Sequence, residues 1–332
     1  MGGHMRRREF VIWLGGGMAV WPFLARAEQP ALKRWRIGSV LVGTPDVVGR
    51  LGAALEQRLA ALGYQNGQNI IILTRIVVPQ PDVVEKAIAA LLPEIDVLVV
   101  GGTIGGVAAK KVASAIPTVF HSVGAPVDIG LVESLAHPGG NLTGISFEAA
   151  IEAHGKRLQL LKEIVPHLAR VAVLRAPGDP NTKVAMTALE QSAPQLGLTL
   201  SPFDVRSTDE LDKAFVDMRR DHMEAVLVVA GSLTYSNGAR IADLALQTHL
   251  PSCHAFREAV IAGGLMSLGP DLVDIARQVA LYLDKIMHGA NPADLPVQEP
   301  NRFDLYLNLR TAAALGLTIP PALLATAEEV IE

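Results

Sequence analysis

The residues that could contact a ligand follow the predicted strands. In a parallel sheet covered by helices, ligands bind at the carboxyl ends of the strands. The short apolar runs of this sequence are followed there by hydroxyl groups, glycines and a few aromatic residues. Such groups orient a small molecule, but they do not by themselves break bonds. The candidate ligand-binding residues are Thr44, Asp46, Gly102, Thr103, Ile104, Ser122, Val123 and Ala125 in the first half, and Ala176, Asp179, Ser232, Tyr235, Phe256 and Leu268 in the second.

Each candidate has a structural interpretation beside the ligand-binding one. The segment GGTIGG (101–106) opens a predicted helix. The free N–H groups of that helix either bind a carboxylate or leave Thr103 as a plain helix cap. The hydroxyl groups of Ser122 and Ser232 could likewise either contact a ligand or have a purely structural role. Tyr235 and Phe256 would either flank a flat ligand or pack in the core.

Catalytic and metal-binding patterns are missing from the sequence. The nine histidines show no H-x-H or H-E-x-x-H spacing, which argues against a zinc site. No G-x-S-x-G segment occurs, and GGTIGG lacks the Gly-Lys-Ser/Thr of a phosphate-binding loop. Cys253 and His254 are adjacent on a predicted strand, so their side chains point to opposite faces. We therefore predict a buried free cysteine, no catalytic site, no metal and no cofactor.

The elements that position these residues alternate between strand and helix. The run 36–42 predicts a strand, 47–64 a helix and 69–77 a second strand, and the alternation continues to residue 122. A similar series restarts with a helix over 152–165 and a strand over 169–176. This order is typical of βαβ units and a parallel sheet. At 332 residues, two α/β lobes with a cleft between them are expected.

The segment LAHPGGNLTG (135–144) concentrates residues that favour special backbone conformations. Glycine permits positive φ and Pro138 ends a helical segment. The segment is either a hinge between the lobes or a tight surface turn. We expect the hinge, with closure about this segment and about 263–271. The expected boundaries are 35–144 plus 266–300 for lobe one, and 145–265 plus 301–332 for lobe two.

The first 27 residues are typical of a cleaved export signal. Arg7 and Arg8 precede an apolar stretch that ends at Ala25-Arg26-Ala27, which predicts a twin-arginine signal peptide cut after Ala27. Removing four arginines and one glutamate changes the net charge from −4 to −7. An acidic chain argues against nucleic acid as a partner. The expected location is the periplasm. Whether residues 1–4 are native is left open.

Several blocks of the sequence resemble a family of ABC transporter substrate-binding proteins. The segment IPTVFHSVGAPVDIGLVESLAHPGGNLTGIS (116–146) is similar to the family signature. Residues 156–174, 256–271 and 293–325 match its later blocks. The resemblance covers nearly all of the chain after the signal peptide.

The resemblance implies a type I periplasmic binding fold, in which three crossings join two Rossmann-like lobes. Some members bind aromatic amino acids, and the ligand passes to a permease and an ATPase in the inner membrane. The sequence departs from the family pattern at Ala125, where an Asp is usual, and at Leu268, where a Tyr is usual. The missing acid argues against a simple amino acid and for a neutral or carboxylate ligand. Asp46, Asp179 and Glu258 are the other acids that could supply a charge.

The function expected from this pattern is capture of a small organic solute for an ABC importer, by a monomeric periplasmic protein. The solute would be an aromatic amino acid or an aromatic or organic carboxylate. A second hypothesis is a periplasmic sensor that presents bound ligand to a membrane receptor. A third, an exported enzyme, would need a nucleophile or metal cluster that the sequence does not show.

Overall fold

A computed structural model describes residues 34–148 and 152–332 of the chain. The expected signal peptide lies outside these residues. The described strands form two separate sheets. One has five strands in the order β2-β1-β3-β4-β5, and the other has seven in the order β12-β11-β10-β9-β8-β6-β7. All of these strands pair in parallel except β10 and β11, which are antiparallel.

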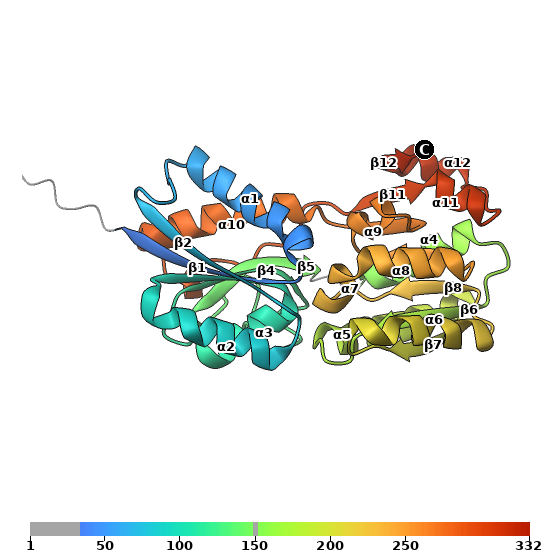
Figure 1. Cartoon of the computed structure of the whole chain (residues 1–332), viewed down its shortest axis with the longest axis horizontal. Helices are drawn as coiled ribbons and strands as arrows, with labels where there is room; N and C mark the ends of the chain where they lie inside the picture. Colours follow the sequence, from blue (N-terminus) through green and yellow to red (C-terminus); the bar gives the residue numbers. More distant parts are fainter. Residues whose placement is uncertain (1–33, 149–151) are drawn as a thin grey trace, which may run out of the picture. The chain divides into compact units, whose positions relative to one another are not determined.

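We call the five-stranded sheet and the helices that cover it lobe one (Figure 1). Helices α1 and α10 lie side by side on one face, and α2 and α3 cover the other. The strands are β1 (Trp35–Val42), β2 (Ile70–Val77), β3 (Val97–Gly101), β4 (Thr118–Gly124) and β5 (Leu142–Glu148). The helices are α1 (Pro45–Ala61), α2 (Pro81–Leu91), α3 (Gly102–Val112) and α10 (Leu272–Met287), with short 3₁₀ turns at Leu92–Glu94 and Pro292–Asp294.

Lobe two is the seven-stranded sheet with its helices. Helices α4 and α5 pack on one face and α6 and α8 on the other. The strands are β6 (Arg170–Arg175), β7 (Thr199–Asp204), β8 (Ala225–Val228), β9 (Ser252–His254), β10 (Met266–Gly269), β11 (Asp304–Asn308) and β12 (Glu329–Ile331). The helices are α4 (Glu152–Ile164), α5 (Asn181–Ser192), α6 (Leu211–Arg220), α7 (Ser232–Ser236), α8 (Gly238–Gln247), α9 (Arg257–Ile261), α11 (Leu309–Ala314) and α12 (Pro321–Thr326), with 3₁₀ turns at Pro194–Leu196 and Thr208–Glu210.

The period-two pattern of the strands explains why each sheet has two covered faces. In β1, Ile37 and Leu41 belong to the core beneath α1 and α10, whereas Val40 and Val42 belong to the core beneath α2 and α3. Successive side chains of a strand point to opposite faces, so a continuous apolar run fills both cores. This confirms the α/β fold with two parallel-sheet lobes that the sequence predicts.

The chain crosses between the lobes three times. The first crossing follows β5, the second joins β10 to α10, and the third lies between Gln298, which bridges to Ile145 of β5, and β11. A buried ion pair lies at the first two crossings. Arg157 Nη1 of α4 is 2.8 Å from Glu148 Oε1 at the end of β5, and Arg157 Nε donates a 2.7 Å hydrogen bond to the carbonyl of Leu268 in β10.

Two expectations about these boundaries need correction. The segment 135–144 connects β4 to β5 inside lobe one, so the hinge expected there is wrong and the alternative of a surface turn holds. The amide of Asn141 fixes this turn through hydrogen bonds to the carbonyls of Ala113 and Ile116. In addition, β5 continues in lobe one to Glu148, while β10 pairs with β9 and β11 in lobe two. Residues 145–148 therefore lie in lobe one and residues 266–269 in lobe two, which is the reverse of the expected assignment.

Candidate functional site

A cavity lies where the strand ends of the two lobes face each other. Its empty volume is about 560 Å³, including its opening to solvent. The lining residues are Leu41, Val42, Val48, Leu51, Gly101, Gly102, Thr103, His121, Ser122, Gly124, Phe147 and Leu272 from lobe one, and Asn181, Ala230, Gly231, Ser232, Tyr235 and Phe256 from lobe two.

One wall of the cavity is apolar and partly aromatic. The ring centroids of Phe147 and Phe256 are 5.0 Å apart, and those of Tyr235 and Phe256 are 4.7 Å apart. Both pairs are tilted, an arrangement that aromatic quadrupoles favour. Phe147 lies near the end of β5 in lobe one, whereas Tyr235 and Phe256 belong to lobe two. The aromatic wall is therefore assembled from both lobes. The hydroxyl oxygen of Tyr235 is buried without a hydrogen-bond partner in the described part of the chain.

The opposite wall is polar because β4 is irregular. The pairing of β4 with β5 shifts register between His121 and Val123. Ser122, the residue between them, has φ of +57°, a strained conformation for a residue that is not glycine. In a regular strand, adjacent side chains would point to opposite faces. The bulge instead lets His121 and Ser122 both line the cavity, with His121 Nδ1 3.2 Å from Ser122 Oγ. Burial lowers the pKa of His121 to about 4, so its imidazole is neutral at pH 7.

Glycines of lobe one meet polar side chains of lobe two around the cavity. A Cβ added at Gly102 would lie 2.7 Å from Ser232 Oγ. A Cβ added at Gly124 would lie 2.4 Å from Oδ1 of Asn181. Such distances are shorter than any ordinary van der Waals contact. The absence of side chains at these positions is what lets the lobes approach so closely.

The charge of the cavity is close to neutral. None of its lining residues is Lys, Arg, Asp or Glu. Asp179 lies behind the lining residue Asn181; it is 3% exposed, and its Oδ1 accepts a 3.0 Å hydrogen bond from the backbone N–H of Asn181. Burial raises the pKa of Asp179 to about 6, although the backbone N–H groups of Asn181 and Ser232 favour its ionised form.

Six of the fourteen predicted site residues line the cavity: Gly102, Thr103, Ser122, Ser232, Tyr235 and Phe256. Ile104, Ala176 and Asp179 border a neighbouring groove. Thr44 and Asp46 are exposed at the start of α1.

The remaining three candidates point away from the cavity. Val123 packs in the core beneath α2 and α3, and Leu268 packs in the core of lobe two. The backbone N–H of Ala125 donates to the carbonyl of Glu148, and its side chain does not line the cavity. Neither Ala125 nor Leu268, the two departures from the family pattern, lines the cavity.

Several lining residues have no clear signal in the sequence. His121 lies inside a predicted strand, where it continues the alternation of Val119 and Phe120 and looks like a core residue. Asn181 begins α5 two residues after the predicted Asp179, so a strand-end argument could have included it. Phe147, Leu51 and Leu272 look like ordinary core residues, and in fact belong to an apolar cluster that continues from the cavity wall into lobe one.

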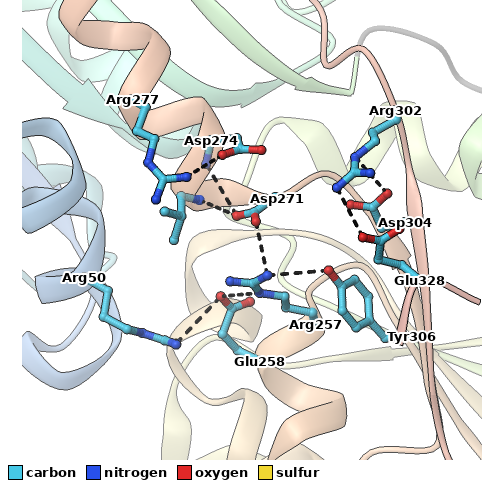
Figure 2. A network of polar contacts seen from close by, with 11 residues as sticks. Arg50, Arg257, Glu258, Asp271, Asp274, Arg277, Arg302, Asp304, Tyr306 and Glu328 are labelled. Atoms are coloured by element: carbon cyan, nitrogen blue, oxygen red, sulfur yellow. Dashed lines mark hydrogen bonds and ion pairs between the residues drawn. The ribbon is translucent and has the colours of Figure 1, made fainter. Parts of the chain in front are cut away.

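An ion-pair network connects the lobes beside the cavity (Figure 2). Arg50 Nη2 of α1 is 3.7 Å from Glu258 Oε1 of α9, so this pair joins lobe one to lobe two. Arg257 Nη1 is 3.1 Å from Asp271 Oδ2, at the second crossing. Burial raises the pKa of Glu258 despite the neighbouring Arg257 and Arg50.

The one cysteine is buried, and the described residues hold no metal-binding group. Cys253 is fully buried, and burial raises the pKa of its thiol to about 12, which keeps it unreactive. Residues 34–148 and 152–332 contain no group of three or more His, Cys, Asp or Glu able to hold a metal ion. No helix in the same residues is long and apolar enough to cross a membrane.

Comparisons with known proteins agree with this arrangement. A family model described as ABC transporter substrate binding protein matches residues 50–331. The Tyrosine-binding protein of Clostridioides difficile is 23% identical over 265 residues, which cover 80% of this chain and 74% of that protein. A conserved domain protein from Vibrio cholerae is 28% identical with a TM-score of 0.83, covering 90% of this chain and 99% of that one. The ABC domain from Streptococcus pneumonia in complex with L-Trp is 23% identical with a TM-score of 0.83, covering 90% and 100%.

Proposed function

Because this chain belongs to the ABC transporter substrate binding protein family, we propose that it captures a small aromatic solute in the periplasm for an importer, by closing its lobes around the solute. Members of the family bind substrates and are not enzymes. The observation that carries the proposal is the cavity between the strand ends, with an aromatic wall and a neutral polar wall.

The chemistry of the two walls supports an aromatic ligand with a polar end. Phe147, Tyr235 and Phe256 offer ring contacts of a kind that add about 0.5–1.5 kcal/mol per pair beyond area burial. Thr103, Ser122 and Ser232 offer hydroxyl groups that both donate and accept hydrogen bonds. An aromatic amino acid or an aromatic carboxylate has this division into a ring and a polar end. The relatives named for tyrosine and crystallised with L-Trp bind ligands of this kind.

Lobe closure is supported by the way the cavity is shared between the lobes. Neither lobe alone supplies the aromatic wall, and Gly102 and Gly124 contact lobe two directly. A ligand that touches both lobes stabilises the closed state because it binds that state more tightly than the open one. We also propose that the protein delivers the solute to a membrane permease and its ATPase. It would act as a monomer, exported by the signal expected in its first 27 residues.

Thermal melting of the chain from Glu28 onward tests the ligand class. This chain contains the whole compact unit Arg34–Glu332. A ligand present at 100 times its Kd should raise the free energy of unfolding by about 2.7 kcal/mol, which is readily seen as a higher Tm. We expect aromatic amino acids or aromatic carboxylates to raise the Tm, and aliphatic amino acids and sugars to leave it unchanged. A shift with sugars alone would contradict the proposal.

Loss of uptake tests the importer role. Deleting the gene from the source bacterium should abolish uptake of the radiolabelled ligand at micromolar concentration. Uptake that continues, together with loss of a transcriptional response to the ligand, would favour the sensor hypothesis instead.

A further inference from the structure

We propose that Arg157 is a positioning residue for ligand capture. It binds the first crossing between the lobes to the second, so that the two crossings bend together and the aromatic wall keeps its shape. This inference rests on the proposed function, because it concerns the lobe closure by which the ligand is captured.

Arg157 contacts the two crossings through different nitrogens of one guanidinium group. Nη1 is 2.8 Å from Glu148 Oε1, at the end of β5 in lobe one. Nε donates a 2.7 Å hydrogen bond to the carbonyl of Leu268, one residue before the end of β10. A guanidinium group is planar and its donors have a fixed geometry. The two contacts therefore hold the ends of β5 and β10 at a fixed separation.

The pair of Arg157 and Glu148 is deeply buried, with side chains that are 1% and 2% exposed. The other oxygen of Glu148 is 3.4 Å from His154 Nε2. Burial lowers the pKa of His154, so its imidazole is neutral at pH 7 and Arg157 is the cation that Glu148 faces. Replacing a buried ion pair by uncharged residues is often neutral for stability, whereas removing one partner is costly. Stability alone therefore does not account for a charged pair at this place.

The aromatic wall of the cavity is attached to this pair. Phe147 directly precedes Glu148 in β5, and successive side chains of a strand point to opposite faces. Phe147 thus lines the cavity while Glu148 meets α4. The place that a Cβ of Gly269 would take, at the end of β10, is 3.6 Å from Phe147 Cζ. A slide of β5 along β10 would therefore move Phe147 away from its partner in lobe two, Phe256.

The third crossing is held to the same strand by the backbone. The N–H of Ser146 in β5 donates a 2.9 Å hydrogen bond to the carbonyl of Gln298. The end of β5 thus contacts the third crossing through its backbone and the second through the side chain of Arg157. A substitution of Arg157 can therefore separate the first crossing from the second while the third stays attached.

Pulsed electron paramagnetic resonance measures how tightly the lobes are held. Spin labels at Ala90→Cys in α2 and Val216→Cys in α6 would lie on exposed surfaces of lobe one and lobe two. Cys253 is fully buried, so the labels should react with the introduced cysteines alone. The spread of distances between the labels then reports how far the lobes move in the ligand-free protein.

The first variant is Arg157→Lys, which keeps the positive charge. Its single nitrogen cannot take the place of both Nε and Nη1, so we expect a broader distribution of distances between the lobes. Arg175→Lys is the matched control, because Arg175 pairs with Asp204 at 2.6 Å inside lobe two. This control should leave the distribution unchanged. An unchanged distribution in Arg157→Lys as well, whatever its Tm, would overturn the role of Arg157.

A double variant separates coupling of the crossings from stability. Combining Glu148→Gln with Arg157→Met removes both charges, so neither is left buried without a partner. The Tm of this double variant should lie closer to that of the unaltered protein than the Tm of Arg157→Met alone does. Its distance distribution should nevertheless stay broad. A distribution that narrows again as the Tm recovers would mean that Arg157 has a structural role alone.

Calorimetric titration with L-tryptophan adds a readout in binding. Arg157→Lys should weaken this binding by about threefold to tenfold, because a smaller fraction of the folded molecules holds the wall in a competent arrangement. Equal affinity in both proteins would contradict the positioning role. The distance measurements need no ligand, so a failure of aromatic ligands to bind would overturn the proposed function alone.

Discussion

At the scale of single residues, the strand ends supply the cavity with neutral polar groups. The sequence predicts Thr103, Ser122 and Ser232 there because a parallel sheet brings its carboxyl ends to one edge. It cannot predict that His121 and Ser122 lie side by side in the lining, because the bulge at Ser122 depends on how β4 pairs with β5. Strand alternation indicates which side chains share a face only where the pairing is regular.

We predict that Asp179→Asn makes the ligand-free protein more stable at neutral pH. The folded-state pKa of Asp179 is raised from 3.8 to about 6, so the folded protein holds this proton more tightly than the unfolded chain does. The resulting stability is fully present below about pH 3.8 and is lost as the pH rises to about 6. Above that range, the ionised carboxyl lowers the free energy of unfolding by about 3 kcal/mol.

Asparagine keeps the carbonyl acceptor but carries no charge, so it avoids this loss. Thermal melting should show a higher Tm for Asp179→Asn than for the unaltered protein at pH 7, and a much smaller difference at pH 4. A variant that is less stable at pH 7 would contradict the burial argument.

At the scale of elements, the alternation of strands and helices is enough to predict both sheets, but not where the chain leaves them. The glycines of 135–144 suggest a hinge, yet Asn141 and the pairing of β5 with β4 keep this segment in lobe one. Strand membership depends on partners that lie far apart in the sequence, such as Leu268 of β10 beside Leu305 of β11, 37 residues later. A local sequence pattern carries no record of such partners.

We predict that Gly124→Ala blocks closure. The φ angle of Gly124 lies outside the left-handed range, so alanine fits the backbone, but its Cβ would meet the Asn181 amide at 2.4 Å. Overpacking of this kind costs about 1–3 kcal/mol, which corresponds to a fivefold to hundredfold loss of ligand affinity. Calorimetric titration measures this loss. Gly140→Ala is the matched control, because nothing lies within 4 Å of its added Cβ.

A double variant shows whether the clash is the cause. Asn181→Ala removes the amide atoms that the new methyl group would meet. Adding Gly124→Ala to Asn181→Ala should therefore cost far less affinity than adding it to the unaltered protein. Equal losses in the two backgrounds would mean that Gly124 acts in some way other than by contact with Asn181.

The pair between Arg50 and Glu258 should favour the closed lobes modestly. Arg50 is 57% exposed, and partly exposed ion pairs contribute about 0.2–1 kcal/mol. Arg50→Met should weaken ligand binding by about twofold to fivefold at low salt, with a smaller effect at 0.5 M salt because of screening. Arg277→Met is the control, since Arg277 pairs with Asp274 of its own helix. If Arg277→Met weakened ligand binding as much as Arg50→Met, the cause would be the change in net charge and not the contact between the lobes.

At the scale of the whole molecule, the family resemblance and the repeated α/β pattern predict the architecture and the class of function. The sequence predicts the residues of the cavity lining less well, because these residues come from two different lobes. Phe147 of lobe one and Tyr235 of lobe two share an apolar cluster where the lobes meet, and nothing in the local sequence of either residue indicates the other.

Small-angle X-ray scattering should therefore detect ligand binding. We expect the radius of gyration to fall when a saturating aromatic ligand is added to the unaltered protein, because the ligand shifts the population toward closed lobes. Gly124→Ala should show a smaller decrease at the same ligand saturation. An unchanged radius of gyration in the unaltered protein, with binding confirmed by calorimetry, would contradict closure.

The contacts of Gly102 with Ser232 and of Gly124 with Asn181 also have a kinetic consequence. They bring the two lobes into direct contact at the polar wall. The contacts that a ligand makes with both lobes must break before the lobes part, so a more tightly bound ligand should also leave more slowly. A membrane partner that holds the lobes apart would release the ligand without competing for any residue inside the cavity.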